Sequence, residues 1–173
     1  EVDANVNGVT VNVGSSSAVT TKAGSTVYFG NGTKAEGSID WNQVGGSFVS
    51  LASVFELSYS GSGPMKMTFE DADVAFSNKV VLGRSSGRAF YEQRGGSLTV
   101  NCTGSGNGFY IGTGNGAGTV SLSNVAFTAV SCPTISNGKG TSMPASDPDG
   151  PFSVLRIDDS TVDFQNGIAV SNP

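Results

Sequence analysis

The sequence predicts an all-β protein, and its composition and patterning give three reasons. Gly, Ser, Thr and Asn together make up 77 of the 173 residues, whereas charged residues make up only 13%. Such a chain has too little Glu, Lys, Leu and Ala for a helical bundle, and its hydrophobic content of 37% is too high for plain disorder. Apolar residues also recur at every second position in segments such as 9–13 and 69–76, which is the period of a half-buried strand.

The same composition excludes several classes of function. The chain contains no histidine, which rules out Ser-His-Asp and Cys-His catalysis and histidine-bound metals. No window approaches the roughly 20 apolar residues of a membrane-spanning helix. Nine basic against 14 acidic residues leave no basic stripe for nucleic acid. We therefore expect no cofactor, no membrane span and no nucleic-acid partner.

Internal repeats give the strongest indication of architecture. Three stretches, 27–41, 80–91 and 109–122, each contain a short apolar strand, a glycine, a turn of small residues and a second strand. The equivalent glycines are Gly30, Gly83 and Gly112. A Gln-x-Gly-Gly-Ser turn leads into a third strand at 43–47 and again at 93–97. We expect these glycines to occupy corners between strands, where the backbone needs positive φ.

A second pair of repeats aligns residues 67–78 with residues 155–166. The alignment matches Asp71 with Asp159 and Asn78 with Asn166. These residues lie between predicted strands, where Asp and Asn side chains stabilise turns, so we predict that they are corner residues. Each coil would hold a strand, a corner, another strand and another corner over about 20 to 30 residues. One coil cannot bury its apolar face alone, so the coils must stack.

The predicted fold is a single β-solenoid domain over residues 1–173, of the parallel β-helix type. A segment poor in apolar residues and rich in Gly and Pro predicts a long loop that extends from a corner near residues 133–151. The alternative fold is a jelly-roll sandwich, which is also built from short alternating strands with glycine turns. It does not require the repeats.

The repeats resemble those of bacterial autotransporter passenger domains and related surface-anchored repeat proteins. The resemblance rests on the strand-Gly-turn-strand units, the Gln-x-Gly-Gly-Ser turns and the following Thr-x-Glu/Asp-Asp-Ala/Ser pattern, over residues 25–130 and 153–170. It implies a secreted, right-handed β-helix that serves as a stalk or adhesin. It implies no catalytic residues, because the repeats of that family are structural.

Two cysteines, Cys102 and Cys132, are the only candidates for a disulfide. In a chain built for the outside of the cell we expect them to be bridged, which would stabilise the fold by about 3 to 4 kcal/mol in the chain-entropy model. The alternative is two buried thiols. The start at Glu1 rather than at methionine fits a mature secreted chain or a piece of a longer one. We therefore expect an extracellular or cell-surface location.

Clustered charges suggest two kinds of site, each with a structural alternative. The acidic clusters comprise Glu70, Asp71 and Asp73; Asp158, Asp159 and Asp163; and Asp147 with Asp149. They could bind Ca²⁺ or act as an acid/base pair, but we favour corner capping and solvated strand faces, because the first two clusters occupy the same repeat position several coils apart. We therefore expect no metal. The basic residues Arg84, Arg88 and Arg94 could bind an acidic sugar as in β-helix lyases; the alternative is that they face outward for solubility.

Aromatic residues could form a ledge for sugar rings, which need a flat apolar face. The candidates for glycan contact are Trp41, Tyr91, Tyr28 and Tyr110. Tyr28 and Tyr110 occupy equivalent places in the repeat and would stack outward if their coils are adjacent. Ordinary aromatic packing within the fold is the alternative.

The two ends share an Asn-Gly-apolar-x-Val pattern, at residues 7–11 and 166–170, and neither carries a recognisable polar cap. We therefore expect the terminal coils to pair with another copy, end to end, or with neighbouring repeats of a longer stalk. The predicted function is that of a non-enzymatic, structural or adhesive solenoid that forms filaments or binds a surface glycan or host receptor. The alternative is a carbohydrate-binding or polysaccharide-degrading β-helix protein of lyase type.

Overall fold

The computed structural model describes residues 8–30, 38–59, 64–102, 108–114, 116–130, 133–136 and 153–171. This part of the chain forms sixteen β-strands and no helix, which confirms the all-β prediction. Every strand pairing in it is parallel. The jelly-roll alternative does not fit, because jelly rolls are antiparallel structures. None of the described segments is a helix long and apolar enough to cross a membrane.

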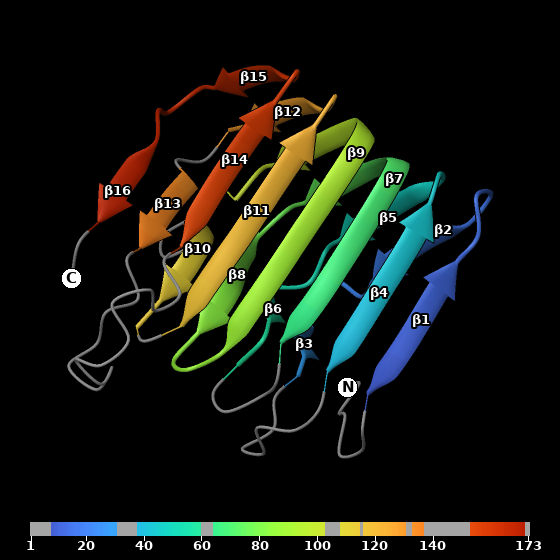
Figure 1. Cartoon of the computed structure of the whole chain (residues 1–173), viewed down its shortest axis with the longest axis horizontal. Coiled ribbons are helices and arrows are strands. Elements are labelled where there is room, and N and C mark those ends of the chain that lie inside the picture. Colours follow the sequence, from blue (N-terminus) through green and yellow to red (C-terminus); the bar gives the residue numbers. More distant parts are fainter. Residues whose placement is uncertain are drawn as a thin grey trace.

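The chain winds repeatedly through three strand segments, and each such round is here called a coil (Figure 1); in two coils the first two segments are one continuous strand. Equivalent strands of successive coils pair and form three sides. Side 1 consists of β1 (Val9–Val13), β4 (Ile39–Val44), the first half of β7 (Met65–Phe76), the first half of β9 (Arg88–Val100), β11 (Ala117–Ser123) and β14 (Val154–Asp158). Side 2 consists of β2 (Ala18–Thr21), β5 (Ser47–Ser50), the second halves of β7 and β9, β12 (Ala126–Ala129) and β15 (Thr161–Phe164). Side 3 consists of β3 (Thr26–Phe29), β6 (Val54–Leu57), β8 (Lys79–Arg84), β10 (Phe109–Thr113), β13 (Pro133–Ser136) and β16 (Ala169–Ser171).

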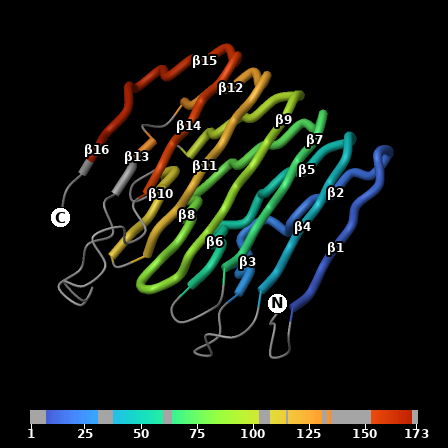
Figure 2. The backbone as a smooth tube through the Cα atoms, viewed as in Figure 1, coloured from blue at the N-terminus to red at the C-terminus, as the bar shows by residue number. Residues whose placement is uncertain are grey.

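Six coils are present in the described residues, and the backbone trace shows them advancing from β1 at one end to β16 at the other (Figure 2). Coil 1 holds β1 to β3, coil 2 holds β4 to β6, coil 3 holds β7 and β8, coil 4 holds β9 and β10, coil 5 holds β11 to β13, and coil 6 holds β14 to β16. Residues that contact across neighbouring coils are 24 apart between coils 3 and 4 but 35 apart between coils 5 and 6. The coils therefore exceed the expected 20 to 30 residues where long connections are inserted.

The first residues of the segment expected to form an extended loop, 133–151, form a strand instead. Residues 133–136 form β13, which pairs with β10 on one side and β16 on the other. The apolar alternation of this short segment is weak, but the neighbouring strands offer it a complete hydrogen-bonding ladder. Residues 137–152 lie outside the described part of the chain.

The corner between sides 1 and 2 is formed by residues with positive φ, which stack from coil to coil. Asp71 (φ 50°), Asn124 (φ 61°) and Asp159 (φ 47°) occupy this corner in coils 3, 5 and 6. Coils 2 and 4 use paired glycines instead. At Gly96 (φ 72°) a Cβ atom would lie 2.1 Å from the carbonyl oxygen of Ala72 in the coil below, so the close stacking of the coils requires glycine there.

The corner at the end of side 3 holds the glycines that the repeats align. Gly30, Gly83 and Gly112 have φ angles of 74°, 78° and 77° and lie one above another in the register of side 3. Coil 2 places Ser58 at the same position, also with positive φ (63°). The turning backbone is thus the same in all four coils, although the residue type is not.

The corner between sides 2 and 3 is stabilised by asparagine side chains. The Asn78 amide donates to the carbonyl oxygen of Leu51 in the preceding coil. Asn166 donates in the same way to Val130. Each amide satisfies a carbonyl that the strand ladder leaves open at the bend, so both residues lie at the corners where the repeat alignment puts them.

Inward-facing side chains form one continuous core. Aromatic rings dominate it, and neighbouring rings contact from coil to coil. The largest fully buried residues include Phe48, Phe55, Phe69, Phe76, Phe109 and Phe127. This stacking explains the alternating apolar pattern. Every second residue of each strand points into the core, where it stacks on the equivalent residue of the next coil.

Candidate functional site

The outer face of side 3 carries a hollow within the described part of the chain. Its volume is about 400 Å³ and it lies over coils 3 and 4. The described residues that line it are Lys79, Val81, Arg84, Ser85, Tyr110, Thr113 and Gly114. We call this hollow the side-3 pocket. It combines two cationic groups, an aromatic ring and two hydroxyl groups, and none of these lining residues is acidic.

An ion pair fixes the position of Arg84 at the rim of this pocket. Arg84 donates from Nη1 to Oε1 of Glu56 at 2.7 Å, and its guanidinium lies 5.2 Å from the ring centre of Tyr59. The Glu56 side chain is only 1% exposed, whereas that of Arg84 is 44% exposed. The hydrogen bond from Arg84 to Glu56 raises the pKa of the guanidinium, which therefore stays charged at any accessible pH.

Glu56 is an outward-facing carboxylate that is nevertheless buried. It pairs in register with Tyr28 on one side and Val81 on the other. No described group donates to its second oxygen, Oε2. Nothing in the repeat pattern indicated this residue, since Glu56 stands at the polar position of an ordinary alternating strand; only the fold brings Arg84 and Tyr59 over it.

The expected aromatic ledge divides into an inner and an outer pair. Tyr28 and Tyr110 face outward on side 3, in the same column, but Glu56 and Val81 separate them, so they do not stack on each other. Tyr28 instead contacts Tyr59, with ring centres 6.4 Å apart.

Tyr91 and Trp41 point into the core and not toward a glycan at the surface. Tyr91 is 1% exposed and donates its hydroxyl to Oε1 of Gln93 at 2.6 Å. Burial raises the pKa of Tyr91 well above its ordinary value. Trp41 packs edge-on against Phe29 and Phe48. The signal that could have placed Tyr91 is its spacing from Gln93, because the two side chains share one face of β9.

The two glutamines of the repeated turn stabilise the corner between sides 1 and 2 from the core. Gln93 donates from Nε2 to the carbonyl oxygens of Ala72 and Ser97, both at 3.0 Å. Gln43 donates to Gly45 at 3.2 Å. Both side chains are buried, so these polar residues have a structural role that their chemistry alone did not indicate.

The arginines expected to line one groove lie at separate places. Arg84 lies on side 3, Arg88 begins β9, and Arg94 lies at the far end of side 1, where it donates to Glu92 at 2.6 Å. Glu92 also pairs with Lys66 at 3.1 Å. Both cations lower the pKa of Glu92, and Lys66 has the larger effect.

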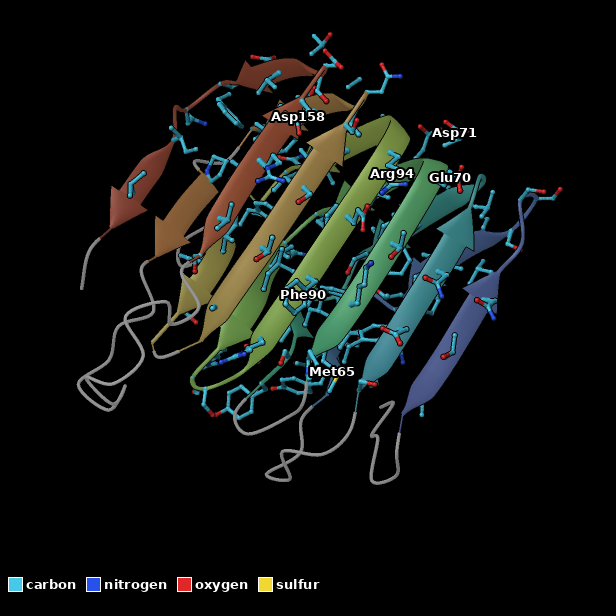
Figure 3. The ribbon with its side chains drawn as sticks, in the orientation of Figure 1. Met65, Glu70, Asp71, Phe90, Arg94 and Asp158 are labelled. Atoms are coloured by element: carbon cyan, nitrogen blue, oxygen red, sulfur yellow. The ribbon has the colours of Figure 1, made fainter. Side chains whose placement is uncertain are left out.

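A second, smaller depression lies on side 1 over Ser121 and Ser123. Its volume is about 330 Å³, and it is bordered by Glu92 and Arg94 on coil 4 and by Arg156 and Asp158 on coil 6. Figure 3 shows Glu70, Arg94 and Asp158 along the same end of this sheet, while Phe90 lies nearer its middle. Acidic and basic groups alternate here, so the depression has no net preference for either charge.

The carboxylate clusters do not converge. Within the described ranges, no three Asp, Glu, Cys or His side chains come close enough to hold a metal ion. Asp71 and Asp159 bend the backbone at their corner, and Asp73 accepts a hydrogen bond from Ser97 at 2.7 Å. Asp147 and Asp149 lie outside the described residues.

The predicted disulfide involves a residue that lies outside the described part of the chain, Cys132. Its partner Cys102 is buried at the end of β9, where its thiol donates to the carbonyl oxygen of Asn78. The bridge therefore stays a prediction.

The chain was compared with protein-family models, curated proteins and solved structures, and none of them matches it. No residue role is therefore transferred from another protein.

Proposed function

We propose that this chain is a right-handed parallel β-helix with a structural or adhesive role at the cell surface, and that it associates end to end. The parallel, in-register stacking of three-sided coils supports the β-helix assignment. In Figure 1 the chain rises along the near sheet, descends behind it and advances from β1 toward β16, which favours a right-handed winding. The extracellular location rests on the composition and on the resemblance of the repeats to passenger domains.

The observation that carries the proposal is the exposure of core-type side chains in coil 6. Val162 stacks on Phe127 of coil 5, and Val170 stacks on β13. Val162 is 36% exposed and Val170 is 76% exposed, whereas Phe127 is 1% exposed. Inward-facing residues with this exposure would be buried by one further coil of the same kind.

The edge strands support the same interpretation. In the described residues, β14, β15 and β16 each pair with only one strand. An edge of parallel strands offers a row of unpaired backbone groups to another chain. Contact between the first coil of one copy and the last coil of the next is head-to-tail, which builds open filaments. This assembly needs no catalytic residue, and we propose that the chain is not an enzyme.

Light scattering and negative-stain microscopy over a concentration series test this proposal. We expect linear stacks that lengthen with concentration. Val170→Lys should abolish them, because it places a charge in the interface between copies. The matched control is Phe90→Lys, which adds the same charge to the outer face of side 1 in coil 4, away from both ends, where Phe90 is 39% exposed, and should leave association unchanged.

A strictly monomeric chain at all concentrations would contradict the end-to-end proposal. An equal effect of Phe90→Lys and Val170→Lys would contradict the assignment of the interface. A pectin or alginate assay in the presence of Ca²⁺ tests the enzymatic alternative, and turnover of either polymer would overturn the non-catalytic part of the proposal.

A further inference from the structure

The side-3 pocket is independent of the end-to-end contact, because it lies on the flank of coils 3 and 4. Its volume of about 400 Å³ falls within the range of small-molecule sites. The floor is Val81, which faces outward and is nevertheless 1% exposed. Val81 lies in register between Glu56 and Tyr110, so an apolar side chain stands between these two polar neighbours.

One wall of the pocket is the ring of Tyr110. This ring lies back along its own strand over Gly108, where an added Cβ would be 2.9 Å from two of its carbon atoms. The absence of a side chain at Gly108 therefore allows the ring to lie low on the sheet. The ammonium group of Lys79 lies over this ring, 5.7 Å from its centre, so a positive charge stands next to the exposed aromatic surface.

Arg84 also lines the pocket, and its guanidinium is held in place before any ligand arrives. Glu56 and Tyr59 fix the guanidinium from the inner side. Because Glu56 neutralises Arg84, the pocket residues together with Glu56 carry a net charge of about +1, which comes from Lys79. The exposed part of the guanidinium keeps its remaining N–H donors available. Hydroxyl groups of Ser85 and Thr113 border the same space.

This set of groups matches the chemistry of one acidic sugar residue. A sugar ring presents an apolar face to an aromatic ring and hydroxyl groups to polar neighbours. A single carboxylate or sulfate complements a single net positive charge and the planar donors of arginine. We propose that the side-3 pocket binds one negatively charged sugar residue of an acidic polysaccharide, with its anionic group on Lys79 and Arg84 and its ring on Tyr110.

Calorimetric titration with defined oligosaccharides tests the site. The probes are trigalacturonic acid, a sulfated disaccharide derived from heparin, neutral maltotriose and inorganic sulfate. We expect at least one acidic saccharide to bind, with an affinity that falls as salt is added, and no binding of maltotriose or of inorganic sulfate. Binding of only the uronate or only the sulfated sugar identifies which anionic group the pocket accepts.

Three variants locate the binding. Lys79→Ala and Tyr110→Ala should each weaken it by roughly tenfold or more, the equivalent of about 1.4 kcal/mol. Lys66→Ala is the matched control, since it removes one lysine charge from the outer face of side 1, where Lys66 pairs with Glu92. This control should bind as the unmodified chain does, and circular dichroism should show the same β content in all three.

Three results would overturn the proposal. Absence of binding by both acidic saccharides would exclude this ligand class. Equal affinity for inorganic sulfate would reduce the pocket to an unspecific anion site. An equal loss in Lys66→Ala and Lys79→Ala would show that net charge, not the pocket, holds the sugar. None of these results bears on end-to-end association, so the two proposals fail or stand separately.

Discussion

Coils 3 and 6 have nearly the same pattern of residues but lie in different surroundings. Phe76 in coil 3 and Phe164 in coil 6 occupy one column of the core, yet Phe76 is 1% exposed and Phe164 is only partly buried. The sequence of a repeat therefore sets the direction of each side chain, whereas the presence of a neighbour on both faces sets its burial. In a stacked fold, stability belongs to the interfaces between coils more than to single coils.

The largest difference should appear when the same aromatic residue is truncated in both coils. Phe76→Ala removes a ring that contacts Phe48, Phe55 and Tyr91 and should lower the free energy of unfolding by about 3 to 5 kcal/mol. Phe164→Ala removes a ring that contacts, among the described aromatic rings, that of Phe127, and should cost about half as much. Urea denaturation followed by circular dichroism measures both. Equal losses would contradict the contrast between the two coils.

Corner glycines give the next contrast. Gly96→Ala combines positive φ with a Cβ 2.1 Å from a backbone oxygen, so we expect a loss of about 3 kcal/mol or more. Gly167 in coil 6 has φ of 75° but no atom within 4 Å of the added Cβ. Gly167→Ala should therefore cost only about 1 to 2 kcal/mol, the conformational penalty alone. Thermal melting of both variants checks the difference, and similar shifts would mean that the coils are less tightly stacked at Gly96.

The smallest effect concerns pH and the ion pairs of coils 3 and 4. The pKa of Glu92 is lowered in the folded chain, chiefly by Lys66, so this carboxylate stabilises the fold above the pKa of an unfolded glutamate. That contribution is lost as the pH falls through the lowered pKa. Its size should be about 1 kcal/mol or less, because its partners are 43% and 70% exposed.

Denaturation of the unmodified chain and of Glu92→Gln at pH 7 and at pH 3 measures this contribution. The difference between the two proteins should shrink at low pH. Coil 6 offers the comparison, since none of the ion pairs within the described residues involves it. A difference that grows at pH 3 would contradict the sign of the Glu92 shift.

Much of the architecture follows from local rules that act on the sequence. The recurring glycines Gly30, Gly83 and Gly112 indicate a bend, because glycine adopts positive φ without steric strain whatever its neighbours are. The alignment of 67–78 with 155–166 also agrees with the register, since equivalent residues lie in the same columns. Periodicity is sufficient for these features because they depend on neighbours along the chain.

Other features depend on contacts between coils, and the periodicity of the sequence does not predict them. In β9, either Phe90 or Tyr91 could have entered the core by alternation alone. The choice is made by Gln93, whose buried amide satisfies backbone carbonyls at the corner and brings Tyr91 inside with it. Phe90 is consequently 39% exposed on the outer face. The Glu56–Arg84 pair joins two coils, 28 residues apart, and has no counterpart in the repeats that would have predicted it.

Hydrogen exchange followed by mass spectrometry, performed at low and at high protein concentration, tests the end-to-end account most directly. We predict that amides in residues 153–171 exchange readily in the dilute chain and become protected as the concentration rises. Amides of coils 3 and 4 should be protected at both concentrations, because these coils have a neighbour on each face. Unchanged exchange in residues 153–171 at high concentration would contradict the claim that a second copy completes the last coil.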